Sequence, residues 1–227
     1  MDRFRHEYKY QIDSATAAIL KIRAQGVLLP DSHVDEDGSY YIRSLYFDDR
    51  QDSCLLENIS GTDPRSKFRI RYYNNNTQRI QLEKKSKQQG MTLKEACTIT
   101  CEECRSLMNG IVPEITQDMP AQKKKLFAER TVRALVPKVI VSYERIPFVY
   151  SGGNVRVTFD RKLTSSLEIA SFLDGNYVSR PVFAKGQSIL EVKWDEILPR
   201  HIQRVLQLDQ LQWTAFSKYG MCRKYHL

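Results

Sequence analysis

Residues 65–73 read RSKFRIRYY, and along this stretch charged and apolar side chains alternate. Successive side chains of a β-strand point to opposite faces of the sheet, so residues of one parity lie together. The basic residues on the first face are Arg65, Lys67, Arg69 and Arg71. The opposite face holds Phe68, Ile70 and Tyr72. The stretch therefore predicts a strand with one basic face and one apolar face.

The same alternation recurs along the chain and predicts further strands. They lie at 4–12, 40–48, 79–87, 91–99, 138–150, 154–160 and 188–195, with a weaker candidate at 163–169. In several of them one face gathers the charged side chains, namely Glu7, Lys9, Glu83, Lys85, Lys94, Arg145, Arg156, Glu191 and Lys193. Helical patterns are predicted between the strands at 14–25, 51–59, 101–109, 119–135 and 199–209.

The predicted elements favour an α+β fold with an antiparallel sheet, because the strands follow one another through short turns and the helices do not alternate with them. One interpretation is an open sheet whose charged face meets water. A sheet of about eight strands usually curls or closes, however. We therefore expect a single domain over residues 1–227, an antiparallel β-barrel whose charged faces line a polar lumen and whose helices pack outside.

Composition bounds the possible partners. In 227 residues, 41% hydrophobic and 27% charged residues exclude a mostly disordered chain, and a net charge of +8 favours nucleic acid, an acidic membrane surface or a phosphorylated small molecule. No segment has the roughly 18 consecutive apolar residues of a membrane-spanning helix, and the start MDRFRHEYKYQ lacks the apolar core of a signal peptide. We expect a soluble, cytoplasmic chain whose five cysteines are reduced.

The charged faces would bring more basic groups than carboxylates into the lumen. Two like charges about 4 Å apart repel by roughly 4 kcal/mol at an effective dielectric constant near 20. Such an interior is tolerable if water or a polyanion fills it, and arginine and lysine suit phosphate oxygens. Glu191, helped by Glu7 or Glu83, could hold Mg²⁺ or Mn²⁺ together with substrate phosphates.

At these residues the sequence resembles the triphosphate tunnel metalloenzymes, specifically the polyphosphate polymerase domain of the vacuolar transporter chaperone group. The matching words cover nearly the whole chain in the family's order. They are EYKY at 7–10, SLYFD at 44–48, KFRIRYY at 67–73, LEKK at 82–85, TLKEA with Lys94, SYERIPF at 142–148, RVTFD at 156–160, ILEVK at 189–193 and FSKY at 216–219.

The resemblance implies an enzyme that moves the γ-phosphoryl group of ATP onto a growing polyphosphate chain, with Mn²⁺ or Mg²⁺ held by Glu191. It implies phosphate contacts from Lys9, Arg69, Arg71, Lys85, Lys94, Arg145, Arg156 and Lys218, with Tyr143 and Ser217 nearby. Their places on the basic faces add Lys193 to the catalytic set and Arg65 to the substrate-binding set. The wider superfamily begins with E-x-E-x-K, where this chain has Arg5, Glu7 and Lys9, and the lost carboxylate favours the polymerase branch over a two-metal hydrolase.

Other functions stay open at this point. A triphosphatase would use the same tunnel with water as acceptor, and a non-catalytic module would only bind polyphosphate or nucleic acid. Nucleic acid is the least favoured partner, because few aromatic side chains accompany the inward basic residues and a duplex would not fit a narrow lumen. The oligomeric state and a separate membrane partner are also left open.

Overall fold

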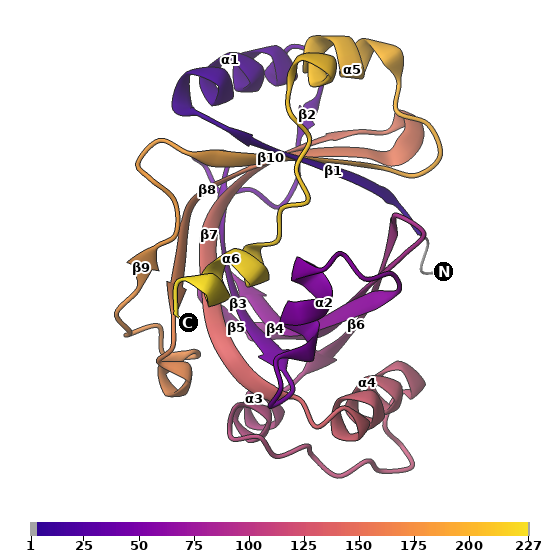
Figure 1. Cartoon of the computed structure of the whole chain (residues 1–227), viewed down its shortest axis with the longest axis vertical. Coiled ribbons are helices and arrows are strands. Elements are labelled where there is room, and N and C mark those ends of the chain that lie inside the picture. The colour runs from indigo at the N-terminus through magenta and orange to yellow at the C-terminus, as the bar shows by residue number, and fades with distance from the viewer. Residues whose placement is uncertain (1–3, 227) are drawn as a thin grey trace.

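The computed structural model of the chain describes residues 4–226, and one curled antiparallel sheet forms its centre (Figure 1). Its strands are β1 (His6–Ile12), β2 (Leu29–Pro30), β3 (Tyr40–Asp48), β4 (Arg65–Tyr73), β5 (Asn76–Gln88), β6 (Met91–Ile99), β7 (Val136–Tyr150), β8 (Val155–Ser166), β9 (Arg180–Pro181) and β10 (Ser188–Trp194). The main path runs β1-β10-β8-β7-β3-β4-β5-β6, while β2 pairs with β7 and β9 with β8. The predicted α+β fold with an antiparallel sheet of about eight main strands is confirmed.

The two end strands of this sheet, β1 and β6, meet beside each other. Arg5, just before β1, forms an antiparallel bridge with Thr92 of β6. The Arg5 amide donates to the Thr92 carbonyl at 2.9 Å, and the Thr92 amide donates to the Arg5 carbonyl at 3.0 Å. We call this pair the seam, because it joins the ends of the curled sheet.

Most of the helices pack on the outer side of the sheet in two groups, and the others lie on its concave side (Figure 1). Their bounds are α1 (Ser14–Gln25), α2 (Ser53–Ile59), α3 (Cys101–Met108), α4 (Ala121–Val132), α5 (Arg200–Val205) and α6 (Lys218–Lys224). One hydrophobic cluster lies between α1, α5 and the strands β1, β8 and β10. A second lies between α3, α4 and the strands β3 to β5. In Figure 1, α2 and α6 lie on the concave side of the sheet, where they contact each other.

The starts of two helices follow local sequence signals. The Asp13 side chain accepts a hydrogen bond from the Thr16 amide at 2.7 Å and caps α1. Thr100 and Glu103 form a capping box at the start of α3. The turn between β4 and β5 begins at Asn74, which adopts a left-handed conformation with φ of 49°.

The structure corrects several element bounds. The two strands predicted at 154–160 and 163–169 form one strand, β8. A β-bulge interrupts its alternation, since Lys162 has φ of 54° and the pairing with β7 shifts register nearby. Such a bulge reverses which side chains face inward, so the alternating pattern predicts two strands where there is one. The helix predicted at 199–209 is only the short α5 followed by a 3₁₀ turn at Leu208–Gln210.

Helix α6 was not predicted from periodicity. Seven residues are too few for a helix to be stable by itself, so tertiary contacts hold it. The Tyr219 hydroxyl donates to Asp48 Oδ2 at 2.5 Å, and Arg223 pairs with Asp52 at 2.7 Å. Both partners belong to the segment that leads from β3 into α2.

No helix within residues 4–226 is both long and apolar enough to cross a membrane. The expectation of a single domain over 1–227 stays a prediction, and residues 1–3 and 227 lie outside the described residues.

Candidate active site

The inner face of the curled sheet carries the charged side chains. In the register of the sheet, Arg69 of β4 lies opposite Glu83 of β5, and Lys9 of β1 lies opposite Glu191 of β10. Directly opposed residues share a face of the sheet. Residues of the alternate parity, such as Phe68, are fully buried in the outer hydrophobic clusters. The charged faces therefore converge on the interior, as the alternation predicts.

Three adjoining cavities follow this interior, and Lys85 lines all of them. The central cavity has a volume of about 80 Å³, and its lining includes Lys9, Arg69, Arg71, Arg145, Lys193 and Lys218. The first mouth has a volume of about 420 Å³ and extends toward Arg5, Tyr73, Lys94, Arg156 and Asp195. The second mouth has a volume of about 90 Å³ and extends toward Arg65, Lys87, Trp213 and Phe216.

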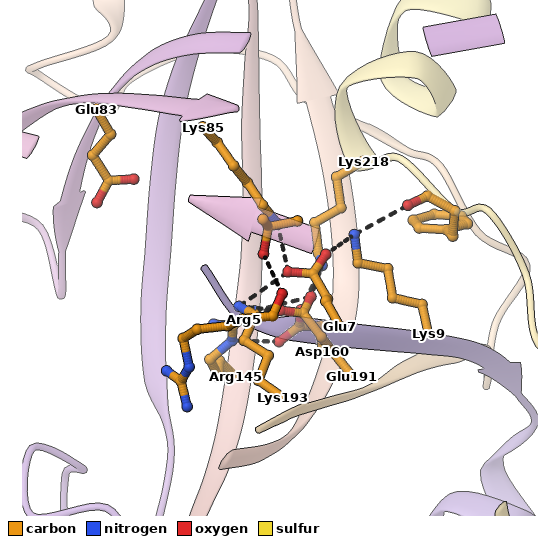
Figure 2. Close-up of polar contacts among 12 residues, drawn as sticks. Arg5, Glu7, Lys9, Glu83, Lys85, Arg145, Asp160, Glu191, Lys193 and Lys218 are labelled. Atoms are coloured by element: carbon orange, nitrogen blue, oxygen red, sulfur yellow. Dashed lines mark hydrogen bonds and ion pairs between the residues drawn. The ribbon is translucent and has the colours of Figure 1, made fainter. Parts of the chain in front are cut away.

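Three carboxylates gather on the wall formed by β1, β8 and β10 (Figure 2). Glu7 Oε1 lies 2.7 Å from Lys9 Nζ, and Glu7 Oε2 lies 2.5 Å from Lys85 Nζ. Glu191 pairs closely with Lys193. Lys193 also lies 3.6 Å from Glu7 and so links the two carboxylates. Burial acts to raise the pKa of both, but the neighbouring lysines hold it well below the usual range.

Asp160 is the third carboxylate, and sequence analysis assigned it no role. It receives two hydrogen bonds from the Arg145 guanidinium, at 2.6 and 2.7 Å, and its Oδ2 lies 2.5 Å from Lys218 Nζ. The signal that could have found it is its parity, because Asp160 lies on the same strand face as Arg156. Its guanidinium and ammonium partners hold Asp160 at the centre of the site.

Glu83 lies apart from these three carboxylates, as Figure 2 shows. Arg69 reaches Glu83 Oε2 at 2.6 and 2.7 Å, and Lys94 reaches Oε1 at 2.8 Å. Burial acts to raise the pKa of Glu83, but Arg69, Arg71 and Lys94 hold it well below its usual range. Both oxygens of Glu83 are therefore occupied in orienting basic side chains.

The carboxylates do not relieve all of the positive charge. Burial, together with the charges of Lys9 and Lys85, lowers the pKa of Lys67 well below its usual range. Its ammonium donates to the Ser217 hydroxyl at 2.7 Å. Burial also lowers the pKa of Lys85 to about 7, although Glu7 opposes the shift. A bound polyanion would stabilise the protonated forms of both lysines.

Buried tyrosines orient the arginines of the central cavity. The Tyr46 hydroxyl accepts a hydrogen bond from Arg69 at 3.0 Å, and the Tyr143 hydroxyl accepts one from Arg71 at 3.0 Å. The Lys218 ammonium lies 4.7 Å from the centre of the Tyr143 ring. Tyr46 and Lys67 were missed as site residues, although both share a face with residues that were named.

The C-terminal segment brings Ser217 and Lys218 to the central cavity. The Ser217 side chain caps α6 by accepting from the Gly220 amide at 3.1 Å. The Phe216 carbonyl accepts from Lys9 Nζ at 3.2 Å. The first strand and the end of the chain thus meet at the site. The sequence indicated this place for residues 216–219 only through the resemblance of FSKY to the family.

The remaining predicted residues lie at the mouths rather than in the central cavity. At the first mouth, the side chain of Lys94 is 52% exposed. Arg156, also there, pairs with Asp31 at 2.6 Å. At the second mouth, Arg65 donates to the Thr62 carbonyl at 2.6 Å.

Arg5, which the resemblance matches to the first carboxylate of the E-x-E-x-K word, is part of the seam and lies at the first mouth. Its guanidinium pairs with Asp195 at 2.8 Å. That position therefore adds a cation to the rim instead of a metal ligand to the lumen.

A divalent metal would have to share this site with a phosphate. Glu191 Oε2 and Asp160 Oδ2 lie 3.8 and 2.5 Å from Lys218 Nζ, so the two carboxylates face one region. Within residues 4–226, no three His, Cys, Asp or Glu side chains are grouped as a complete metal site. Magnesium commonly takes one or two carboxylates and completes its shell with water and substrate phosphates, which this donor set fits. The metal roles of Glu191, Glu7 and Glu83 stay predictions.

Comparisons with known proteins agree with the fold. The family model of the VTC domain matches residues 4–226. No curated protein sequence matches the chain.

Among solved structures, the chain is similar to a putative adenylyl cyclase from Hippeastrum with a dominant triphosphatase activity. The two share 12% identity with a TM-score of 0.57, over 100% of this chain and 97% of that chain. The chain is also similar to a putative adenylate cyclase from Bacillus halodurans, with 15% identity and a TM-score of 0.55 over 95% of both chains. At these identities the likeness shows the fold alone.

Proposed function

The chain belongs to the VTC domain family, and we propose that it is a metal-dependent polyphosphate polymerase. In this reaction the γ-phosphoryl group of ATP is transferred to the end of a polyphosphate chain, and ADP is released. The family and the tunnel-like site support an enzyme that acts on triphosphates. That the phosphoryl group goes to a polyphosphate chain rather than to water is the part of the proposal that the experiment below tests.

The observation that carries the proposal is the basic lining from one mouth to the other. Lys94 and Arg156 lie at the first mouth, Arg69 in the central cavity, and Arg65 and Lys87 at the second mouth. A polymerase must hold a donor triphosphate and an acceptor chain at once, so it needs basic groups along the whole passage. A triphosphatase needs them at one end only.

Positioning and charge stabilisation would provide the catalysis. The terminal oxygen of the acceptor chain attacks the γ-phosphorus, the bond from phosphorus to the β–γ bridging oxygen breaks, and that oxygen leaves with ADP. Arg69, Arg71 and Arg145 surround the central cavity and would spread the charge that develops on the transferred group. The acceptor is already an anion, so no protein nucleophile is required.

The predicted metal, Mn²⁺ or Mg²⁺, would neutralise charge on the phosphate oxygens when Glu191 holds it with Glu7 or Asp160. The ammonium group of Lys193, which now pairs with Glu191, would then be free to contact a phosphate. The carboxylates would thus hold the metal, while Arg69 and Arg71 would hold the phosphates.

One observation favours a second candidate function. The Hippeastrum protein shares the fold and has a dominant triphosphatase activity. In that reaction water would replace the polyphosphate acceptor, and the same arginines would hold the triphosphate.

The test is to incubate the protein with ATP, Mn²⁺ and a short polyphosphate primer and to measure every product. We expect ADP and long polyphosphate chains. Glu191→Gln should reduce turnover by at least about 100-fold, which corresponds to about 2.7 kcal/mol of transition-state stabilisation. Binding of tripolyphosphate should persist in this variant, because Arg69 and Arg71 are intact.

Glu144→Gln is the matched control, since this carboxylate lies on the outer face and pairs with Arg161 and Lys162. Its turnover should equal that of the unmodified chain. If orthophosphate forms in an amount equal to the ADP and no polymer appears, the protein is a triphosphatase and the polymerase proposal is wrong.

A further inference from the structure

A second cavity opens beside the first mouth, and we call it the side cavity. It has a volume of about 350 Å³, and its lining includes Tyr40, Tyr73, Arg79, Gln81 and Arg156. Small-molecule sites commonly have volumes of about 300–1,000 Å³. The side cavity is therefore large enough for a ligand group that the central cavity, at about 80 Å³, has no room for.

The side cavity is continuous with the phosphate passage. Tyr40, Tyr73 and Arg156 line both the side cavity and the first mouth, where Arg71 and Arg145 also lie. A triphosphate held by these arginines would place whatever is attached to its α-phosphate next to the side cavity. In a nucleoside triphosphate, that attached group is the nucleoside.

The side cavity offers an aromatic surface. The rings of Tyr40 and Tyr73 meet edge to face, with centroids 5.6 Å apart and planes at 77°. Tyr40 is buried, and its hydroxyl accepts a hydrogen bond from Arg156 at 2.9 Å. Tyr73 is only half-buried, so it is the ring available to a ligand. Stacking on an aromatic ring accepts any nucleobase, since every base has a π-face.

Two polar side chains in the side cavity are available to form hydrogen bonds. Gln81 lies opposite Arg71 in the β4–β5 register and therefore on the inner face. Among the residues that the structure describes, neither the Gln81 amide nor the Arg79 guanidinium has a side-chain partner. A glutamine amide matches the N6 and N7 edge of adenine, and an arginine matches the O6 and N7 edge of guanine. The pair thus suits the edge of a purine.

The second mouth differs from the side cavity in size and in charge. Its cavity has a volume of about 90 Å³, and it is rich in lysines and arginine, which suits a phosphate chain better than a base. Its exposed aromatic residue, Trp213, already contacts Tyr8, with ring centroids 5.9 Å apart. The two ends of the passage therefore differ in the ligand chemistry that they fit.

We propose that the side cavity binds the purine base of the nucleoside triphosphate, with Tyr73 stacking on the base and Gln81 and Arg79 contacting its edge. This inference rests on the proposed function, because it requires a triphosphate in the passage. It assigns the nucleoside to the first mouth and leaves the second mouth to the polyphosphate chain.

The experiment compares the affinities for ATP and tripolyphosphate by calorimetry, in the unmodified chain and in Tyr73→Leu, Gln81→Leu and Trp213→Leu. Tyr73→Leu should weaken ATP binding about tenfold, which corresponds to about 1.4 kcal/mol and lies within the range for base stacking. Gln81→Leu should weaken ATP binding several-fold. Neither variant should change tripolyphosphate binding, and Trp213→Leu should leave the ratio of the ATP affinity to the tripolyphosphate affinity unchanged.

The ratio of the two affinities separates a base contact from a folding defect, because a damaged fold would weaken both ligands alike. The proposal is overturned if Tyr73→Leu and Gln81→Leu keep the unmodified affinity ratio, or if Trp213→Leu alone loses ATP. Absence of tripolyphosphate binding in the unmodified chain would overturn the proposed function itself, and the side-cavity assignment with it.

Discussion

The two faces of strand β4 are both buried, but one buries apolar side chains and the other buries charged ones. Outward, Phe68, Ile70 and Tyr72 are completely buried in a hydrophobic cluster. Inward, Arg69 and Arg71 are held by carboxylate, hydroxyl and aromatic partners. Burying apolar area stabilises the fold directly, whereas burying charge costs desolvation energy that ion pairs offset only in part. The difference indicates that the outer face maintains the fold and the inner face serves a ligand.

The largest effect should come from the outer face. Phe68→Ala would leave a cavity in the cluster and lower the free energy of unfolding by about 3–5 kcal/mol. Chemical denaturation measures this loss, and tripolyphosphate titration under native conditions should show an unchanged affinity for the folded fraction. A loss below about 1 kcal/mol would contradict the assignment of fold stability to this face.

An intermediate effect should come from the inner face when ligand is present. Tripolyphosphate at a hundredfold excess over its dissociation constant should stabilise the unmodified chain by about 2.7 kcal/mol. If Arg69→Ala weakens binding tenfold, the stabilisation at the same concentration falls to about 1.4 kcal/mol. Thermal melting with and without the ligand measures both values.

Ile70→Val is the matched control, one residue away on the opposite face. It should lower the stability of the free chain by about 0.5–1.5 kcal/mol and leave the ligand-induced increase unchanged. Equal ligand responses in the two variants would remove the functional distinction between the faces.

The smallest effect should appear at acid pH, where carboxylates of the two faces can be compared. The pKa of Glu83 lies well below its usual range, and Arg161 and Lys162 overcome burial to lower the pKa of Glu144 to about 2. Each carboxylate thus binds its proton more weakly in the folded chain. Its stabilisation is present above about pH 4.5 and is lost as the pH falls toward the folded pKa.

Denaturant midpoints from pH 7 down to about pH 2 test this comparison, because the two carboxylates differ only as the pH approaches the folded pKa of Glu144. Glu83→Gln should flatten the acid loss of stability more than Glu144→Gln, because Lys162 is 73% exposed and water screens its pairing with Glu144. Equal slopes for the two variants would show that inner and outer carboxylates contribute alike.

Alternation along single strands predicted most of the fold and the convergence of the charged side chains. It could not join 154–160 to 163–169, because the bulge near Lys162 reverses parity within one strand. It also could not predict α6, whose stability depends on Tyr219 reaching Asp48 across the fold. Local patterns carry no record of such long-range contacts.

The candidate site was predicted in the same partial way. The arginines and Glu191 stood out because their strands alternate clearly. Asp160 was passed over, although it lies on the same strand face as Arg156, because no partner was visible in the sequence. The side cavity could not be predicted from the sequence, since Tyr40 and Gln81 belong to different strands and only the folded sheet brings them near each other.

The seam between Arg5 and Thr92 joins the two end strands of the curled sheet through polar contacts. Besides the two backbone hydrogen bonds, the Thr92 hydroxyl donates to the Arg5 carbonyl at 3.3 Å. The ion pair of Glu7 with Lys85, at 2.5 Å, also ties β1 to β5 on this side of the sheet. Opening the sheet at the seam would therefore separate a buried ion pair as well as backbone hydrogen bonds, and separating such a pair costs more free energy than a neutral hydrogen bond does.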